Sequence, residues 1–178
     1  MSLYNIVVSS NESTVVAEYA AEYDRSNSYQ SEAHLEQDFI KRLQEQGYEY
    51  IRFADEAGLI ANLRLQIERL NDYKFFDSEW ERLCNEYLIN KNEGIVEKTR
   101  KIQVDERHSF RLDNGLTKNI AILDKKNIHN NRLQVINQYE ESAGSHETRY
   151  DVTILVNGLP LVHVELKRRG VAIREAFN

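Results

Sequence analysis

The stretch that decides the fold is residues 150–170, with the sequence YDVTILVNGLPLVHVELKRRG. Two apolar runs flank Asn157-Gly158, a dipeptide preferred in two-residue connections between antiparallel strands. Asp151 opens the first run, and the second ends in Glu165-Leu-Lys167. Side chains two apart on a strand leave the same face, so Glu165 and Lys167 point the same way. The pattern predicts a β-hairpin with two carboxylates and one ammonium at its open end.

These three side chains suit the hydrolysis of a phosphodiester. Mg²⁺ held by one or two carboxylates, with several waters retained, neutralises phosphoryl charge and makes hydroxide available near pH 7. We expect Asp151 and Glu165 to be the metal ligands, with the carbonyl of Leu166 as a third, and Lys167 to orient or help deprotonate the attacking water. This set resembles that of PD-(D/E)-x-K nucleases. The alternative is a surface aspartate near an exposed Glu/Lys pair, because Glu-x-Lys alone is common by chance.

The hairpin geometry sets a condition on this hypothesis. With a regular two-residue turn, position 150 faces 165, and Asp151 then lies on the face opposite Glu165 because side chains alternate. A three-residue loop, Asn157-Gly158-Leu159, or a bulge brings 151 opposite 165 instead. The catalytic interpretation therefore requires one irregularity.

Composition narrows the class of protein. The 178 residues suit one domain with appendages, and no run approaches the roughly 20 apolar residues of a membrane span. One cysteine, Cys84, excludes an internal disulfide framework, and with no signal peptide at the N-terminus it favours the cytoplasm. The net charge of −6 argues against a general nucleic-acid binder. Basic residues nevertheless crowd the C-terminal end beside the proposed site, and local charge decides where phosphates approach.

The N-terminal half predicts helices and one strand. Residues 1–27 form a polar arm with one short element near Val15–Tyr19. Ser31 is the expected N-cap of a helix whose apolar stripe includes Leu35, Phe39, Ile40 and Leu43 and ends at Gly47. A short strand is expected over 48–53, followed by a helical insertion over 56–101.

Within the insertion, Ser78 with Glu81 matches a capping box. The stripe of Trp80, Leu83, Tyr87 and Leu88 is interpreted as core.

Strands dominate after residue 118, with segments expected over 119–125, 133–139 and the hairpin. These strands and the first helix are predicted to share one continuous core. The fold class is therefore mixed α/β, with a mostly antiparallel sheet flanked by helices and a helical insertion.

Five segments together resemble the N-terminal nuclease domain of the R subunit of type I restriction-modification enzymes. They are residues 28–36 (SYQSEAHLE), 77–80 (DSEW), 94–100 (GIVEKTR), 123–127 (LDKKN) and the run 149–178. The resemblance covers about Ser28 to the end, which makes 28–178 the endonuclease domain. It implies a PD-(D/E)-x-K core and Mg²⁺-dependent cleavage of double-stranded DNA, with Asp151, Glu165 and Lys167 on the catalytic positions.

The resemblance also implies partners, namely double-stranded DNA, methylation and specificity subunits, and a motor domain in the full-length subunit. No Gly-x-x-x-x-Gly-Lys-Ser/Thr loop is present, so ATP is expected only in the full-length subunit and not on this chain. The family's Gln-x-x-x-Tyr motif follows the segment that matches Phe177-Asn178. We therefore expect this chain to be truncated at its C-terminus.

Further site residues are expected with less direct support. Glu32 and Glu36 share one side of the first helix, and Glu36 is the better placed auxiliary acid, although a solvent-facing carboxylate remains the alternative. His163 is interpreted as structural. Three arginines, Arg168, Arg169 and Arg174, are candidates for contacts with the DNA backbone or the motor. Rival hypotheses are an inert docking fragment and a solitary DNA-repair nuclease of the same fold.

Overall fold

The computed structural model describes residues 4–9, 15–19, 31–53, 55–90, 92–141 and 148–167. The elements are β1 (Tyr4–Ser9), β2 (Val15–Tyr19), α1 (Glu32–Glu45), β3 (Glu49–Tyr50), α2 (Glu56–Asn71), α3 (Asp77–Leu83), η1 (Cys84–Leu88), α4 (Ile95–Gln103), β4 (Arg107–Arg111), β5 (Thr117–Ala121), η2 (Ile128–Asn130), β6 (Leu133–Glu141), β7 (Thr148–Val156) and β8 (Leu159–Val164). The predicted mixed α/β class is confirmed. The helix expected from residue 171 lies outside the described residues. No helix in the described ranges is long and apolar enough to cross a membrane.

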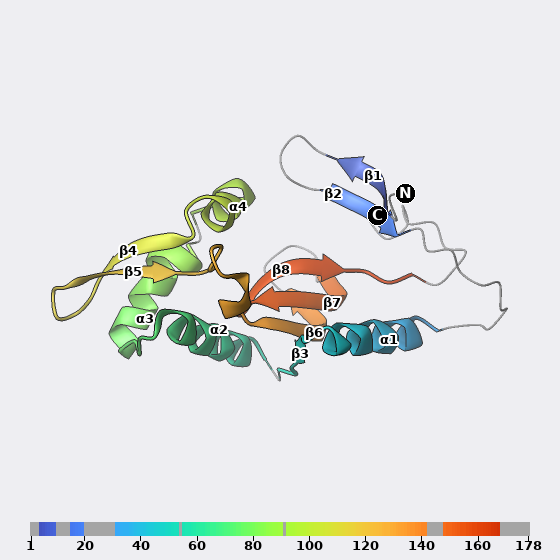
Figure 1. Ribbon diagram of the computed structural model, residues 1–178, viewed down its shortest axis with the longest axis horizontal. Helices are drawn as coiled ribbons and strands as arrows, with labels where there is room; N and C mark the ends of the chain where they lie inside the picture. Colours follow the sequence, from blue (N-terminus) through green and yellow to red (C-terminus); the bar gives the residue numbers. More distant parts are fainter. Residues whose placement is uncertain are drawn as a thin grey trace.

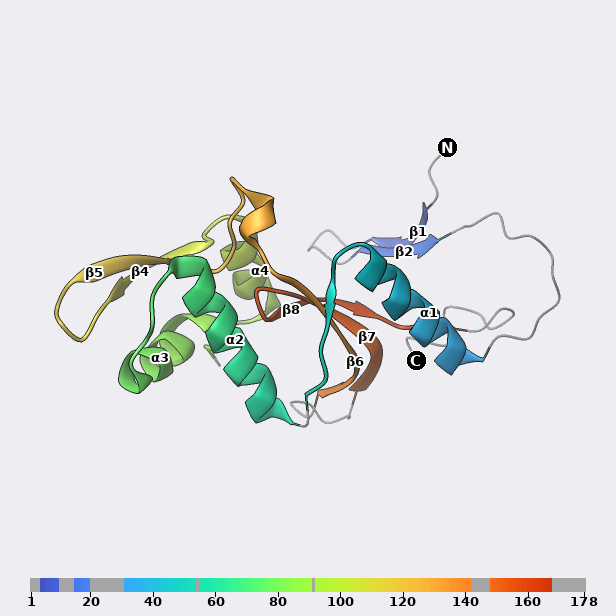
Figure 2. The same ribbon diagram turned by 60° about the horizontal axis from the view of Figure 1, so that its bottom comes forward.

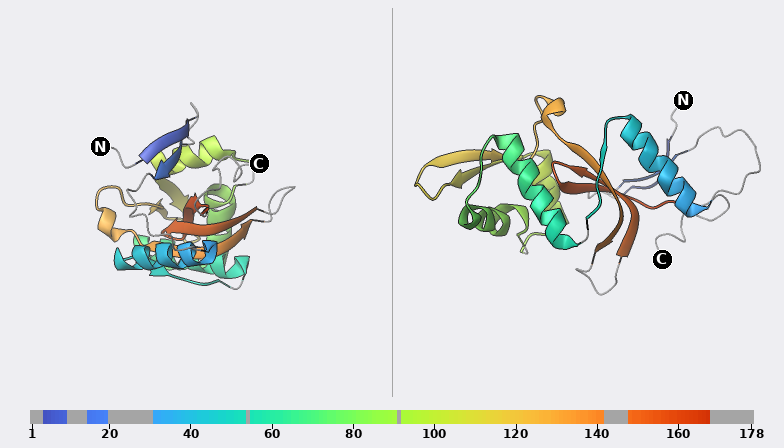
Figure 3. Two further views of the ribbon diagram at one scale, coloured as in Figure 1. Left: turned by 90° about the vertical axis from the view of Figure 1, so that its right-hand side faces the viewer. Right: turned by 90° about the horizontal axis from the view of Figure 1, so that it is seen from below.

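The described strands form one four-stranded sheet and two two-stranded ribbons. In the sheet the order is β3-β6-β7-β8, with β3 parallel to β6 and the other pairs antiparallel. Helix α1 contacts β3, β6 and β7 and lies along one face of this sheet (Figure 3). At the N-terminus, β2 occupies the predicted Val15–Tyr19, and β1 pairs with it as a strand that the sequence pattern did not predict.

Helix α1 follows its sequence closely. Ser31 Oγ accepts a hydrogen bond from the His34 amide at 3.2 Å, which confirms the predicted N-cap. Ile40 and Leu43 are buried against the sheet. The chain leaves the helix at Gly47, whose φ of +92° favours glycine. The strand that follows is shorter than expected, since β3 covers only Glu49–Tyr50 of the predicted 48–53.

The insertion is helical as predicted, but it does not end with its helices. After α4 the chain forms the ribbon β4-β5, which packs on α2 and extends away from the four-stranded sheet (Figure 1). The strand expected over 119–125 was therefore misplaced: it is Thr117–Ala121, and it pairs with β4, which the sequence pattern missed. Ile120 and Ile122 of the apolar run are buried, but they pack against the helices of the insertion and are not part of the core of the four-stranded sheet.

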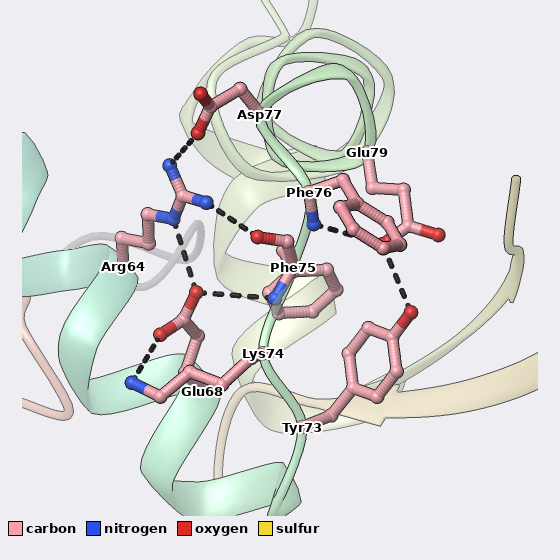
Figure 4. Close-up of polar contacts among 8 residues, drawn as sticks. All are labelled: Arg64, Glu68, Tyr73, Lys74, Phe75, Phe76, Asp77 and Glu79. Atoms are coloured by element: carbon pink, nitrogen blue, oxygen red, sulfur yellow. Dashed lines mark hydrogen bonds and ion pairs between the residues drawn. The ribbon is translucent and has the colours of Figure 1, made fainter.

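Two acidic side chains hold the connection between α2 and α3 (Figure 4). Glu68 accepts hydrogen bonds from Arg64, Lys74 and the amide of Phe75. Glu79, only 1% exposed, accepts from the amide of Phe76 at 3.1 Å. The predicted capping box was therefore wrong in register by two residues: the N-cap is Phe76 and not Ser78, and the acid at the third helical position is Glu79 and not Glu81. Ser78 instead donates to Asp113.

Substitution of Glu79 by Gln is expected to destabilise the fold by about 2 kcal/mol. The carboxylate also accepts from the Tyr73 hydroxyl at 3.0 Å and from the Asp113 amide at 2.9 Å. An amide keeps one acceptor oxygen and turns a donor NH₂ toward donors in a buried place. Chemical denaturation measures the change, with exposed Glu81→Gln as the matched control. An equal midpoint for the two variants contradicts the assigned role.

The single continuous core expected from the sequence was also wrong. One buried cluster, which includes Ile67, Leu83, Phe110 and Ile120, lies within the insertion and its ribbon. The other joins α1 to the four-stranded sheet through Ile40, Leu43, Val135 and Val152. The insertion with its ribbon and the four-stranded sheet with α1, which contain the two clusters, lie side by side along the molecule (Figures 1 and 2).

A polar seam connects these two clusters. Gln134 of β6, fully buried, accepts from Asn62 of α2 at 2.9 Å, and Gln66 donates to Asn62 at 3.2 Å. At the tip of the hairpin, Asn157 is 1% exposed and donates to the Ile122 carbonyl and the Asn131 side chain. The tip of the β7-β8 hairpin is therefore buried against Ile122, Asn131 and, through Gly158, Leu63 of α2 instead of lying in solvent.

Candidate active site

The β7-β8 hairpin contains the irregularity that the site requires. Its turn has two residues, and positive φ at both Asn157 and Gly158 is typical of type I′. Val156 pairs with Leu159 and Leu155 with Pro160, but Ile154 pairs with Val162, so Leu161 is an extra residue in a β-bulge. Beyond the bulge, Val152 pairs with Val164.

This register brings the two proposed ligands to the same level of the hairpin. In an antiparallel ladder the next pair beyond Val152–Val164 joins Asp151 to Glu165, so these two residues lie opposite each other. A hydrogen bond confirms that the two segments lie close together here, because Asp151 Oδ2 accepts from the Leu166 amide at 2.7 Å. Lys167 Nζ donates to Glu165 Oε1 at 2.7 Å, with about a third of each side chain exposed. All three proposed site residues therefore lie at the open end of the hairpin.

A fourth charged residue, Glu32 of α1, acts electrostatically on Lys167. The hydrogen bond to Glu165 raises the pKa of Lys167 above its ordinary value; partial burial opposes the shift, and the charges of Glu165, Glu32 and Asp151 support it. Lys167 therefore carries a positive charge at neutral pH. Three carboxylates around one ammonium leave the site net negative, which favours a cation there.

The donor set fits a magnesium ion that keeps most of its waters. Among the described residues no three His, Cys, Asp or Glu side chains are grouped closely enough to enclose a metal. Asp151 and Glu165 supply two carboxylates, and within the described chain Asp151 Oδ1 and Glu165 Oε2 have no hydrogen-bond partner. Mg²⁺ is commonly bound by one or two carboxylates plus water.

The two acids of α1 have different neighbours. Glu36, the expected auxiliary acid, accepts from Asn137 Nδ2 of β6 at 2.7 Å. Glu32, one turn earlier, is the helix acid whose charge acts on Lys167. The spacing of Glu32 and Glu36 indicated a shared side of the helix, but not which of them approaches the hairpin, because that depends on how far α1 extends along the sheet.

His163 lies next to the proposed site along the strand. It is paired with Thr153, and Thr153 Oγ1 lies 3.0 Å from His163 Nδ1. This contact is consistent with the structural role assigned to it from the sequence. The candidate DNA contacts Arg168, Arg169 and Arg174 lie outside the described residues.

Sequence reasoning missed three polar residues near this end of the sheet, namely Tyr50, Arg52 and Asn137. Asn137 and Tyr50 are linked at 2.8 Å and Tyr50 and Arg52 at 2.9 Å. One signal was available: Asn137 interrupts an otherwise apolar alternation of Leu133 and Val135 on the face toward α1. A polar side chain on a buried face indicates a polar partner.

Comparisons with known proteins identify the family of this chain. Residues 29–178 match the family described as the N terminus of the type I restriction enzyme R protein. The chain is 47% identical over 173 residues to the type I restriction enzyme EcoprrI endonuclease subunit of Escherichia coli, covering 97% of this chain and 55% of that protein. It is 37% identical to the SsaAORF53P endonuclease subunit of Staphylococcus saprophyticus and to the SauMSSORF170P endonuclease subunit of Staphylococcus aureus MSSA476.

The staphylococcal matches cover 84% and 85% of this chain. The chain spans about half the length of the E. coli relative and 16% of the staphylococcal ones. The family match nevertheless includes α1, the four-stranded sheet, the insertion and the hairpin with its acids. The chain therefore belongs to the family of type I restriction enzyme R proteins and corresponds to their N-terminal part.

Proposed function

We propose that this chain is the magnesium-dependent endonuclease domain of its R protein, and that it hydrolyses phosphodiester bonds of double-stranded DNA. The observation that carries the proposal is the bulge at Leu161, which sets Asp151 opposite Glu165 beside Lys167. A regular hairpin separates these groups onto opposite faces, so the irregularity supports a functional site. The endonuclease names of the relatives support the reaction class.

The residues divide the chemistry among them. Asp151 and Glu165 hold Mg²⁺, with the Leu166 carbonyl as a further ligand. Bound Mg²⁺ supplies charge neutralisation at the phosphoryl group and a more acidic water near pH 7. Lys167, charged at neutral pH, orients the attacking water and offsets charge on the phosphate. The Leu166 amide fixes the carboxylate of Asp151 in place through its hydrogen bond.

The partners follow from the same proposal. In the complete R protein this domain works beside an ATP-driven motor and in a complex with methylation and specificity subunits, and the choice of DNA target belongs to those subunits. ATP is not a ligand of this chain. Three basic residues follow Lys167 in the sequence and are proposed to contact the DNA backbone or the motor: Arg168, Arg169 and Arg174.

The test compares this chain with one extended by a few tens of residues of the same R protein. We expect residues 1–178 to bind duplex DNA weakly and cut it poorly, because Lys167 and the three arginines after it are only about four phosphate-reaching cations, whereas tight binders neutralise roughly 6–10 phosphates. The extended chain is expected to bind Mg²⁺ by calorimetry and to cut duplex DNA, with EDTA abolishing cleavage.

Two other results separate the rival hypotheses. Robust cutting by residues 1–178 alone shows an autonomous nuclease. Absence of Mg²⁺ binding and of cleavage in both chains supports a docking fragment instead.

A further inference from the structure

A chain of hydrogen bonds runs from α1 to the outer strand of the sheet. Asn137 Nδ2 donates to Glu36 Oε1 at 2.7 Å, and the Tyr50 hydroxyl donates to Asn137 Oδ1 at 2.8 Å. Arg52 Nε then donates to the Tyr50 oxygen at 2.9 Å. The Arg52 guanidinium carbon also lies 5.4 Å from the centroid of the Tyr50 ring. The series ends in an arginine whose orientation its neighbours fix.

Each member of the series sets the role of the next. The Glu36 carboxylate can only accept when ionised, so it takes the Asn137 NH₂ and turns the amide oxygen toward Tyr50. The Tyr50 hydroxyl donates its one proton to that oxygen, which leaves its lone pairs for Arg52. Glu36 thereby fixes the orientation of the Asn137 amide.

Register places Arg52 at the same end of the sheet as the proposed active site. Tyr50 pairs with Val135 in the parallel β3-β6 ladder, so Arg52 continues level with Asn137. Asn137 pairs with Val152, and both lie on the face of the sheet toward α1, whereas the side chain of Asp151 leaves the opposite face. Two strand spacings, roughly 10 Å, separate the Arg52 and Val152 positions along this end of the sheet.

We propose that Arg52 binds a backbone phosphate of the DNA that enters the active site, and that Tyr50, Asn137 and Glu36 orient it. The inference rests on the proposed function, since it takes DNA as the substrate. Arg52 is exposed, and with Nε held by Tyr50 its two Nη groups have no partner among the described residues. A guanidinium held in this way presents a planar pair of donors that matches phosphate oxygens.

The chemistry of the site also calls for such a contact. Glu32, Asp151 and Glu165 make the catalytic end net negative, and this repels a phosphate backbone until a metal binds. A cation two strands away attracts the flanking phosphate without competing for the metal. Preorientation lowers the entropy lost when the side chain is immobilised by DNA.

The test measures binding of a short duplex by fluorescence anisotropy in EDTA over a series of NaCl concentrations. Arg52→Gln is expected to weaken binding about threefold to tenfold at low salt and to reduce the salt slope of the affinity by about 0.9. The matched control is Arg107→Gln, which removes an exposed arginine of the ribbon β4-β5, away from the proposed site. Both variants lose one charge, so the difference between them isolates a local contact.

Tyr50→Phe supplies a second readout, because it keeps the ring and removes the orienting oxygen. We expect it to weaken binding in the wild-type background and to add nothing to Arg52→Gln, since the two act as one unit. Equal affinity and slope for Arg52→Gln and Arg107→Gln overturn the inference, as does an additive double variant.

Because binding is measured without Mg²⁺, the result is independent of catalysis. A wild-type chain that binds as expected in this assay but never cuts after extension overturns the proposed function and leaves the phosphate contact standing.

Discussion

Alanine at Asp151, Glu165 or Lys167 in the full-length R protein is expected to abolish DNA cleavage, a loss of several orders of magnitude, while ATP-driven translocation continues. In the proposed function the two acids supply the charges that hold Mg²⁺, and Lys167 supplies the charge next to the phosphate. In the proposed function the motor lies in a different part of the R protein, so we expect its ATP hydrolysis not to depend on these groups. Plasmid cleavage and a triplex-displacement assay for translocation measure the two activities separately.

Asp151→Asn sharpens this prediction. The amide oxygen still accepts from the Leu166 amide, so the local structure is kept, while the negative charge is lost. If Asp151 binds metal, the Asn variant keeps wild-type thermal stability and loses cleavage as fully as the Ala variant. Glu81→Ala, on the exposed side of α3, is the control for a lost acid elsewhere. Normal cleavage by any of the three site variants removes that residue from the chemistry.

Gly158→Ala is expected to lower the free energy of unfolding by about 3 to 4 kcal/mol. At φ +81° any side chain is strained, and a methyl carbon here lies 2.7 Å from Leu63 Cα and 3.1 Å from Leu63 N. Both contacts are with the backbone of a helix, which cannot move aside as a flexible side chain can. The hairpin tip or α2 has to shift, and the polar seam beside them is disturbed.

Gly115→Ala is the matched control. Gly115 has nearly the same φ, +83°, but nothing lies within 4 Å of an added carbon. Gly115→Ala is therefore expected to lower the free energy of unfolding only by the cost of the left-handed conformation, about 1 to 2 kcal/mol. Urea denaturation of both variants gives the difference between strain alone and strain plus steric clash. Equal losses for the two glycines contradict the close packing of the turn on α2.

The same contact explains which irregularity the hairpin uses. The sequence left two ways to bring Asp151 opposite Glu165, a longer loop or a bulge. A longer loop has no room, because Asn157 is buried and Gly158 touches α2. The bulge is at Leu161 instead, next to Pro160, which has no backbone N–H and so cannot donate to the ladder.

Local signals were enough for several parts of the fold. The N-cap at Ser31, the extent of α1, the insertion helices and the hairpin turn were predicted because each depends on residues within one or two turns of the chain. The three proposed site residues were also identified from spacing and residue type, and their shared position at the open end of the hairpin agrees with that spacing. Their roles in catalysis stay predictions.

Tertiary contacts decided the remainder. An apolar run such as 119–125 shows that a strand is buried but not which sheet it joins. Here the strand pairs with β4 and packs against α2 in the cluster of the insertion. The division into two cores, the choice of Glu32 over Glu36 near Lys167 and the orientation of Arg52 depend on side chains far apart in sequence. The sequence by itself determined the local elements and the residue types at the candidate site, because these depend on neighbouring residues. Only the packing of α1 and α2 against the sheet decided the register that brings Asp151 opposite Glu165, because that register depends on the space left around the turn.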